Sequence, residues 1–306
     1  MGAYIFRRVL LAIPTLWGVM TLVFISIHLI PGNPAEAMLY GKASPQAIAE
    51  LSHRMGLDQP LPVQYWNFMT HAIHLDFGSS ISNQIPVFQE INDRFPTTLE
   101  LAAAGMFFAL LVAIPLGVLS AMKERSAMGK GSALISILGI SIPEFWLGPM
   151  LALVFGLELH WLPIAGLGDW KNFILPGLTL GTGLGSFLAR IIRASLLEVM
   201  GTDFVRTAKA KGLTNRIITI RHVARNALIP VVTVVGLSVA TLLGGVVIVE
   251  NIFSLPGLGS LAVTAVINRD FPTIQGTTFF FAVILIAANL LVDISYVLID
   301  SRIQYS

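Results

Sequence analysis

The sequence has few charges and no cysteine. Asp, Glu, Lys and Arg make up 12% of its 306 residues, against about 25% in soluble globular domains. So few charges cannot cover a water-exposed surface, and the hydrophobic share of 55% with a mean hydropathy of +0.79 predicts a membrane protein. The absence of cysteine excludes disulfides, thiolate nucleophiles and cysteine-ligated zinc or iron–sulfur sites.

Motifs for catalysis are also missing. A phosphate-binding loop needs Gly-Lys followed by Ser or Thr, with a further Gly five residues before the pair. Neither Gly41-Lys42 nor Gly129-Lys130 meets this requirement. The sequence has no His-Glu-x-x-His and no Gly-x-Ser-x-Gly, which are signatures of zinc proteases and serine hydrolases. We therefore expect that the chain is not an enzyme, with no catalytic residues and no cofactor of its own.

Long apolar runs dominate the sequence. Runs of about 20 residues are long enough to cross the hydrocarbon core of a bilayer. Six are present, at residues 9–30, 97–121, 132–157, 173–197, 227–249 and 277–299. The first is too long for the apolar region of a signal peptide, and no small-x-small cleavage site follows it. The predicted fold is an all-α membrane protein with six transmembrane helices: residues 1–30 hold the N-terminus and first helix, 31–96 an external insert, and 97–306 the core.

The basic residues predict the orientation. If both termini lie on one side, that side carries 14 of the 19 Lys and Arg residues. Such an excess marks the cytoplasmic side. We therefore expect a multi-pass chain with both termini in the cytoplasm and cytoplasmic loops near 122–131 and 198–226.

The external insert is expected to hold two short helices. Ser44 can cap a helix that begins at Pro45 and ends before Gly56. A second helix is predicted from Pro62 to Ile73. Its apolar face would consist of Val63, Trp66, Met69 and Ile73.

Two histidines of the insert could begin a metal site. His71 and His74 lie three residues apart, but only Asp76 stands near them as a further ligand. We therefore favour coincidence and expect no metal site.

The loop at 198–226 is basic and has the pattern of two helices. Asp203 can cap a helix over 204–211 that Gly212 ends, and Thr214 can cap another that reaches Asn226. Two interpretations are open: a charged loop lying against anionic lipid, or a rigid element that docks on another protein. The helix–glycine–helix pattern favours docking, because a lipid-attracted loop does not need it.

The same loop resembles a known motif. Residues 206–212 read Arg-Thr-Ala-Lys-Ala-Lys-Gly, and Pro230 follows after Asn226. This is similar to the coupling loop of bacterial ABC importer permeases, in which Glu-Ala-Ala precedes the Gly. Arg206 and Thr207 depart from that general form but match the dipeptide/oligopeptide/nickel branch. Further pieces of that branch occur in order along the chain, at 7–8, 13–16, 56–61, 76–78, 174–176, 249–253, 256–259, 269–272 and 300–303.

The resemblance implies a type I importer permease of the bacterial inner membrane, the first of a pair, that moves short peptides. It implies a second homologous permease, two cytoplasmic ATPase subunits that carry ATP and Mg, an external solute-binding protein, contact with membrane lipid and no nucleic acid. Nickel chelates or glutathione are alternative substrates, and an ion-driven secondary transporter is a remote alternative. The residues expected to couple to the ATPases are Asp203, Arg206, Thr207, Ala208, Lys209, Lys211, Gly212, Leu213, His222, Asn226 and Pro230.

Ionisable residues inside spans are candidates for the substrate pathway, because they are costly in the bilayer unless paired or hydrated. The alternative is pairing between helices, for example of Asp293 with Arg190 or Arg193. Two adjacent glycines in the fifth span could mark a bendable stretch near the pathway. The pathway candidates are Glu144, Gly244, Gly245, Glu250 and Asp293.

A different set of glycines is expected to serve packing. Gly177, Gly181 and Gly185 are spaced by four in the fourth span. This spacing places them on one side of a helix, where they let a neighbouring helix approach closely. The alternative is that they line the substrate pathway.

Overall fold

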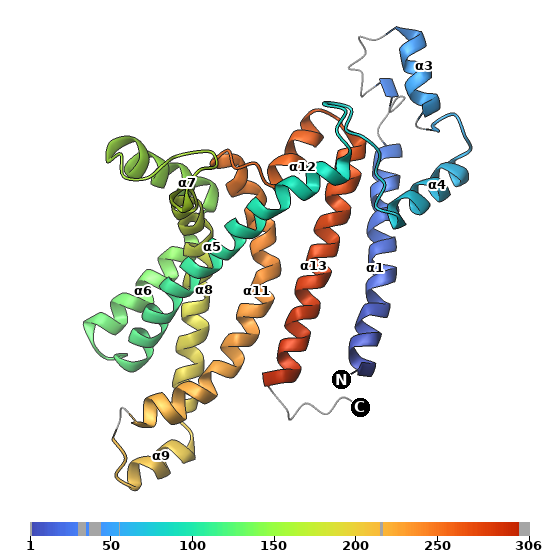
Figure 1. Ribbon diagram of the computed structural model, residues 1–306. Helices are drawn as coiled ribbons and strands as arrows, with labels where there is room; N and C mark the ends of the chain where they lie inside the picture. Colours follow the sequence, from blue (N-terminus) through green and yellow to red (C-terminus); the bar gives the residue numbers. More distant parts are fainter. Residues whose placement is uncertain (1, 30–34, 37–43, 55, 215–216, 300–306) are drawn as a thin grey trace. The chain divides into compact units, whose positions relative to one another are not determined.

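The computed structural model describes residues 2–29, 35–36, 44–54, 56–214 and 217–299. Within these ranges the chain is helical apart from turns, loops and one isolated bridge between Ser79 and Pro86 (Figure 1). It divides into two compact units, Met1–Thr97 with Pro256–Ala287, and Thr98–Leu255 with Ala288–Ser306. The predicted all-α fold is confirmed.

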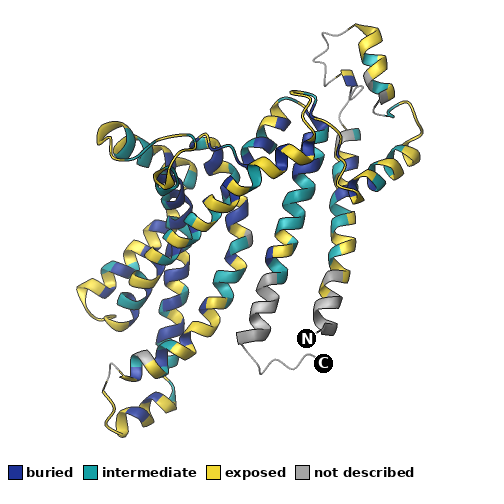
Figure 2. Ribbon diagram, viewed as in Figure 1, coloured by how far each residue is buried: buried dark blue, intermediate teal, exposed yellow. Residues whose placement is uncertain are grey.

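The second unit is built around α8 (Ile174–Met200), which packs against α6, α7 and α11. In its most apolar stretch 56% of the residues are buried, against 22–28% in the other long apolar helices, and α8 is accordingly dark blue along much of its length in Figure 2. The other elements of this unit are the later part of α5 (Val87–Met122), α6 (Ala127–Ser141), α7 (Glu144–Leu151), the π-helix η1 (Ala152–Glu158), the 3₁₀-helix η2 (Trp170–Phe173), α9 (Asp203–Ala210), the π-helix η3 (Ile218–Ala224) and α11 (Arg225–Ile252).

The glycine ridge of α8 packs against α5, as predicted. A Cβ added to Gly181 would lie 2.7 Å from the backbone nitrogen of Ala109, and one added to Gly185 would lie 2.6 Å from its carbonyl oxygen. A Cβ on Gly177 would meet the ring of Phe108 at 2.8 Å. The two backbones can therefore approach this closely only because these positions lack side chains.

The predicted span at 132–157 is not a single helix. Helix α6 ends at Ser141, and the α7–η1 segment continues at an angle of 103° to it. The break falls at Ile142 and Pro143, whose ψ angles of 116° and 140° are extended. Proline has no N–H to donate and sterically disfavours a helical conformation in the residue before it. Hydropathy runs unbroken through the bend, which is why the apolar pattern concealed it.

The first unit contains α1 (Gly2–His28), α3 (Pro45–Arg54), α4 (Leu61–Ile73), the start of α5, α12 (Leu258–Ile267) and the described part of α13 (Phe271–Ile299) that belongs to it. Its largest apolar cluster joins side chains from all of these except α3, among them Met20, Met69, Val87, Ile91 and Leu258. A Cβ added to Gly276 of α13 would lie 2.5 Å from Val87, so α13 and α5 meet closely there.

The two helices of the insert are confirmed. The Ala47 N–H donates to the Ser44 hydroxyl at 3.3 Å, and Gly56 has the left-handed φ of +65° that ends such a segment. The predicted apolar face of α4 is not the side through which the helix packs. Helix α4 packs through Tyr65, Phe68, Met69 and Ala72, so Met69 is buried whereas Val63, Trp66 and Ile73 are exposed.

Among the described residues, four helices are long and apolar enough to cross a membrane, or five if the bent α6–α7 pair counts as one. The apolar stretch of α1, Leu10–Ser26, is shorter than the other spans. A total of six spans therefore requires that α1 also crosses the membrane.

Candidate functional site

The predicted coupling loop begins with α9, which protrudes beyond the ends of α8 and α11 (Figure 1). Thr202 precedes it in an extended conformation, and Asp203 is its first residue. The prediction that Asp203 caps the helix is therefore wrong by one residue. The Asp203 carboxylate instead accepts a hydrogen bond from Arg206 at 3.3 Å, one turn into the helix. Both side chains are exposed, so this ion pair contributes little to stability.

Gly212 ends α9, as the sequence indicated. Its φ is +77°, a conformation that side chains disfavour. Its N–H donates to the Lys209 carbonyl at 3.0 Å, and the Leu213 N–H donates to the Ala208 carbonyl at 3.3 Å. This pair of bonds is a Schellman motif, which satisfies carbonyls that the helix end leaves free.

One side of α9 packs against α8 and η3 and attaches the helix to them. Val205 and Ala208 are buried in an apolar cluster with Leu196 of α8 and Val223 of η3. Ala208 is therefore part of the attachment, and it does not present a contact surface. The exposed side carries the predicted coupling residues Arg206, Thr207, Lys209 and Lys211, together with Phe204, while Gly212 and Leu213 are exposed just past the helix end.

The second predicted helix of the loop does not end before Pro230. Residues 215 and 216 lie outside the described residues, and from Ile218 the π-helix η3 continues directly into α11. Pro230 is inside α11 and exposed. Proline is tolerated in a membrane helix where local π adjustments and side chains satisfy the freed backbone groups, and η3 lies immediately before this stretch.

Two polar contacts hold the start of α11. The Asn226 side-chain amide donates to the His222 carbonyl at 2.7 Å, one turn earlier. The Ser195 hydroxyl of α8 donates to the Ala227 carbonyl at 2.9 Å, and this bond is buried. Of the predicted coupling residues in this stretch, Asn226 is exposed and His222 is half-buried.

Two of the five pathway candidates meet. Glu144, in the first turn of α7, is half-buried and directs its carboxylate at Gly245 of α11. A Cβ on Gly245 would lie 3.0 Å from Glu144 Oε2 and 3.0 Å from Leu180. Because Gly245 has no side chain, the Glu144 carboxylate can occupy the space beside it. Gly244 is exposed, with open space where a Cβ would be.

Glu250 has a different environment. It is fully buried near the end of α11, and the Thr98 hydroxyl of α5 donates to its Oε1 at 2.6 Å. A carboxylate enclosed in this way links two helices and does not line an open passage. The side chain of Asp293, the fifth candidate, lies outside the described residues.

Sequence reasoning missed a buried polar contact in the first unit. The Ser80 hydroxyl donates to Asp270 Oδ2 at 2.5 Å, and the Thr273 N–H donates to Asp270 Oδ1 at 3.4 Å. Asp270 therefore caps α13 and holds the segment around Ser80 in place. Asp270 belongs to the motif piece at 269–272, and Ser80 lies two residues after the piece at 76–78, so the sequence marked the neighbourhood of this contact but not the pair.

The histidines of the insert contact their own helix. His71 Nδ1 lies 2.7 Å from the Asn67 carbonyl, and His74 Nδ1 lies 2.8 Å from the Thr70 carbonyl. Within the described ranges no group of three or more His, Cys, Asp or Glu side chains could hold a metal ion.

Two family descriptions match consecutive parts of the chain. Residues 113–305 match the family described as "Binding-protein-dependent transport system inner membrane component", and residues 1–102 match the N-terminal region described for such components. The glutathione transport system permease protein GsiC of Escherichia coli K12 is 41% identical over 302 residues, which cover 99% of each chain. GsiC of Salmonella typhimurium LT2 has the same identity and coverage.

Solved structures share the fold at lower identity. An inward-facing MetNI methionine ABC transporter structure superposes with a TM-score of 0.59 at 19% identity, covering 69% of this chain and 97% of that one. An amino acid ABC transporter crystallised with histidines superposes with a TM-score of 0.54 at 16% identity, covering 68% and 93%. The long helices are therefore arranged as in type I importer permeases.

Proposed function

Because the chain belongs to the family of binding-protein-dependent transport system inner membrane components and is a permease of an ABC importer, we propose that it imports short peptides and that α9 couples it to an ATPase partner. A permease of this class works with a second permease, ATPase subunits and a binding protein. The proposal assigns ATP hydrolysis, with its Mg, to those ATPase subunits.

The geometry of α9 carries the coupling proposal. Val205 and Ala208 fasten the helix to the cluster that also holds α8 and η3. Its exposed side presents Arg206 and Lys209, which suit a partner surface that is acidic or rich in carbonyl oxygens. A displacement of α9 by its partner would therefore move α8 and α11, since the apolar anchor resists sliding. A loop held against anionic lipid by its charge alone would not need this apolar attachment to α8 and η3.

Glutathione is the first substrate to test. It is a modified tripeptide, and relatives of this chain that share 41% identity over nearly the whole length are named for its transport. Nickel chelates remain an alternative with less support on this chain.

Reconstitution tests the transport proposal. The permease pair and ATPases are placed in proteoliposomes with the binding protein, and uptake of labelled glutathione and of dipeptides is measured with and without ATP. We expect ATP-dependent uptake that proton uncouplers leave unchanged at constant ATP. Uptake by this chain alone, or uptake driven by an ion gradient without the ATPases, would refute it.

Two variants test the coupling role of α9. Gly212→Pro cannot adopt φ of +77° and loses the N–H that bonds Lys209, so we expect insertion to persist while substrate-stimulated ATP hydrolysis and uptake are lost. Lys209→Glu reverses one exposed charge of α9 and should weaken ATPase copurification. Lys130→Glu, at an exposed position in the first turn of α6, is the matched control. Equal copurification of Lys209→Glu and Lys130→Glu would contradict a docking role for this face.

The proposed orientation places α9 and both termini in the cytoplasm. A thiol-reactive, membrane-impermeant reagent applied to intact cells should label Ala47→Cys in α3 and leave Lys209→Cys unlabelled. The reverse pattern would overturn the orientation. The chain has no cysteine of its own, so each signal comes from the introduced residue alone.

A further inference from the structure

Helix α4 has three distinct sides. Tyr65, Phe68, Met69 and Ala72 belong to the apolar cluster shared with α1. Trp66 and Ile73, two helical turns apart, point away from that cluster and are 68% and 78% exposed. With Pro62, which is also exposed, they form one stripe, because positions 62, 66 and 73 fall on one side of a helix with 3.6 residues per turn. We call these three residues the outer stripe.

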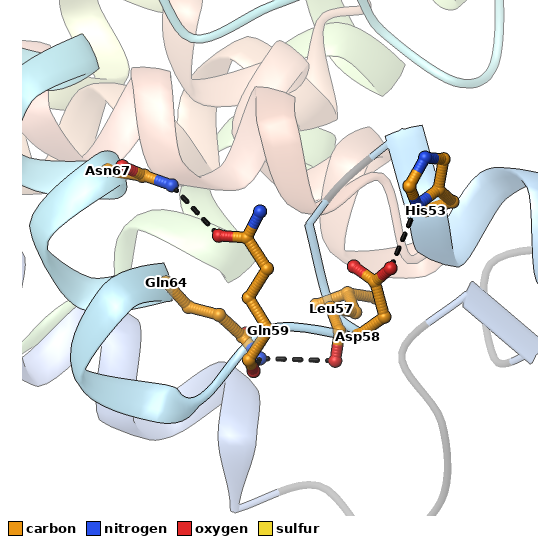
Figure 3. Close-up of polar contacts among 6 residues, drawn as sticks. All are labelled: His53, Leu57, Asp58, Gln59, Gln64 and Asn67. Carbon is orange, nitrogen blue, oxygen red and sulfur yellow. Dashed lines mark hydrogen bonds and ion pairs between the residues drawn. The ribbon is translucent and has the colours of Figure 1, made fainter.

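The third side of α4 is polar and makes hydrogen bonds with the preceding turn. Figure 3 shows the Gln64 amide donating to the Leu57 carbonyl at 3.1 Å and the Asn67 amide donating to the Gln59 side chain at 3.3 Å. Gln64 also donates to the Gln59 carbonyl at 2.7 Å. The segment from Leu57 to Gln59 therefore binds the side of α4 that carries Gln64 and Asn67, and it leaves the outer stripe open.

The contacts with α1 fix how deep α4 lies. The Tyr65 hydroxyl is 2.8 Å from the Thr21 hydroxyl, and Gln64 Oε1 is 3.0 Å from His28 Nε2. Phe24, between them, packs edge-on against the Tyr65 ring. At about 1.5 Å per residue, the stretch of α1 from residue 21 to residue 28 is about 10 Å long. It begins inside the apolar stretch Leu10–Ser26 of α1 and ends just past it.

Helix α4 therefore lies beside the last turns of α1, which form the outer end of a span in the proposed orientation (Figure 1). Between residues 21 and 29 the described side chains that are exposed are those of Leu22, Ile25, Ser26 and Leu29, so all but Ser26 are apolar. Such side chains face lipid. The outer stripe continues that apolar surface from α1 onto α4.

We propose that α4 is an interfacial helix that buries its outer stripe in the outer leaflet of the membrane. A helix in the plane of the interface places its apolar side about 5–10 Å into the boundary between headgroups and acyl chains. Tryptophan is enriched at that depth, because its ring is apolar and its N–H can reach polar groups. The polar side of α4, with Gln64, Asn67 and His71, cannot lie in the hydrocarbon core, so the helix lies at the boundary and not deeper.

The external insert would then be attached at two places, to α1 and to the membrane surface. The insert holds α3 and α4, and α4 would fix the insert to the bilayer as well as to α1. An exposed helix face with the same composition could instead bind the second permease or the binding protein, and the test separates these cases.

Spin labels on single cysteines measure the surroundings directly, and the chain has no native cysteine that would also react. Ile73→Cys and Trp66→Cys report the outer stripe. Asn67→Cys, exposed on the polar side of the same helix, is the matched control. Ile25→Cys on α1 is the lipid reference. The complete transporter is labelled in proteoliposomes, and collision with oxygen is compared with collision with a water-soluble nickel chelate.

We expect the labels at Ile73 and Trp66 to collide with oxygen more than with the nickel chelate, as at Ile25, and the label at Asn67 to show the opposite order. High nickel accessibility at Ile73 and Trp66 would place the stripe in water. Low accessibility to both reagents in the complete transporter would mean that a protein covers it. Either result overturns the proposal. Neither depends on which solute is transported.

Discussion

The close contact between α8 and α5 makes a sharp prediction about Gly181. In Gly181→Ala, the new methyl group would lie 2.7 Å from the backbone nitrogen of Ala109 and 2.8 Å from the carbonyl oxygen of Gly105. Ordinary contact begins near 3.4 Å, so the two helices must separate by about 0.7 Å. Both atoms belong to backbone, and no flexible side chain can yield in their place.

The size of the effect follows from two opposing contributions. Overfilling a packed contact costs about 1–3 kcal/mol, and replacing Gly by Ala in a helix interior gains up to about 1 kcal/mol. Gly183→Ala isolates the gain, because Gly183 lies on the same helix with nothing within 4 Å of an added Cβ. We therefore expect Gly183→Ala to be neutral or stabilising and Gly181→Ala to be less stable than it by about 1–3 kcal/mol.

The assay is thermal inactivation of the purified permease in detergent, followed as loss of the monodisperse peak. Membrane proteins often unfold irreversibly, so all variants are heated at one rate and their midpoints compared. Gly185→Ala, whose methyl group would lie 2.6 Å from the Ala109 carbonyl oxygen, should behave as Gly181→Ala does. Equal midpoints for Gly181→Ala and Gly183→Ala would refute the close-approach argument.

Two further predictions concern polar contacts. Thr98→Val removes the donor to the buried Glu250 carboxylate and should cost about 1–3 kcal/mol in thermal stability, whereas Thr264→Val, at an exposed hydroxyl that bonds only within its own helix, should cost little; equal losses would contradict the assignment. The hydrogen bond from His53 lowers the pKa of Asp58, so its contribution to stability is present above the carboxyl's usual pKa and is lost as pH falls through the lowered value. Site-resolved NMR titration should find the Asp58 pKa higher in His53→Ala than in the parent, and an unchanged pKa would show that the bond does not form.

Local signals predicted the ends of the short helices well. Ser44 and Gly56 bound α3, and Gly212 ends α9 with a left-handed φ, because a cap or a terminating glycine depends on a few adjacent residues. The four-residue glycine spacing in α8 predicted close packing for the same kind of reason. Such features need no knowledge of distant parts of the chain.

The sequence does not predict whether a proline in an apolar run breaks a helix or is accommodated inside it. Pro143 separates two helices by a 103° bend, whereas Pro230 lies inside α11. Both interrupt the backbone hydrogen bonds of a helix in the same chemical way. The outcome depends on which neighbouring elements pack around each proline and satisfy the freed groups. Those neighbours are set by tertiary packing, which hydropathy does not contain.

The ionisable residues of the spans show the same limit, and they sort into two roles. Sequence reasoning treats Glu144 and Glu250 alike, because each is a carboxylate in or beside an apolar run. The structure separates them: Glu250 is fully enclosed and bonded to Thr98, 152 positions away, whereas Glu144 is half-buried beside Gly245. A carboxylate that already holds two helices together has little freedom to meet a solute. Glu144, next to a residue without a side chain, keeps that freedom and is the stronger candidate for the pathway.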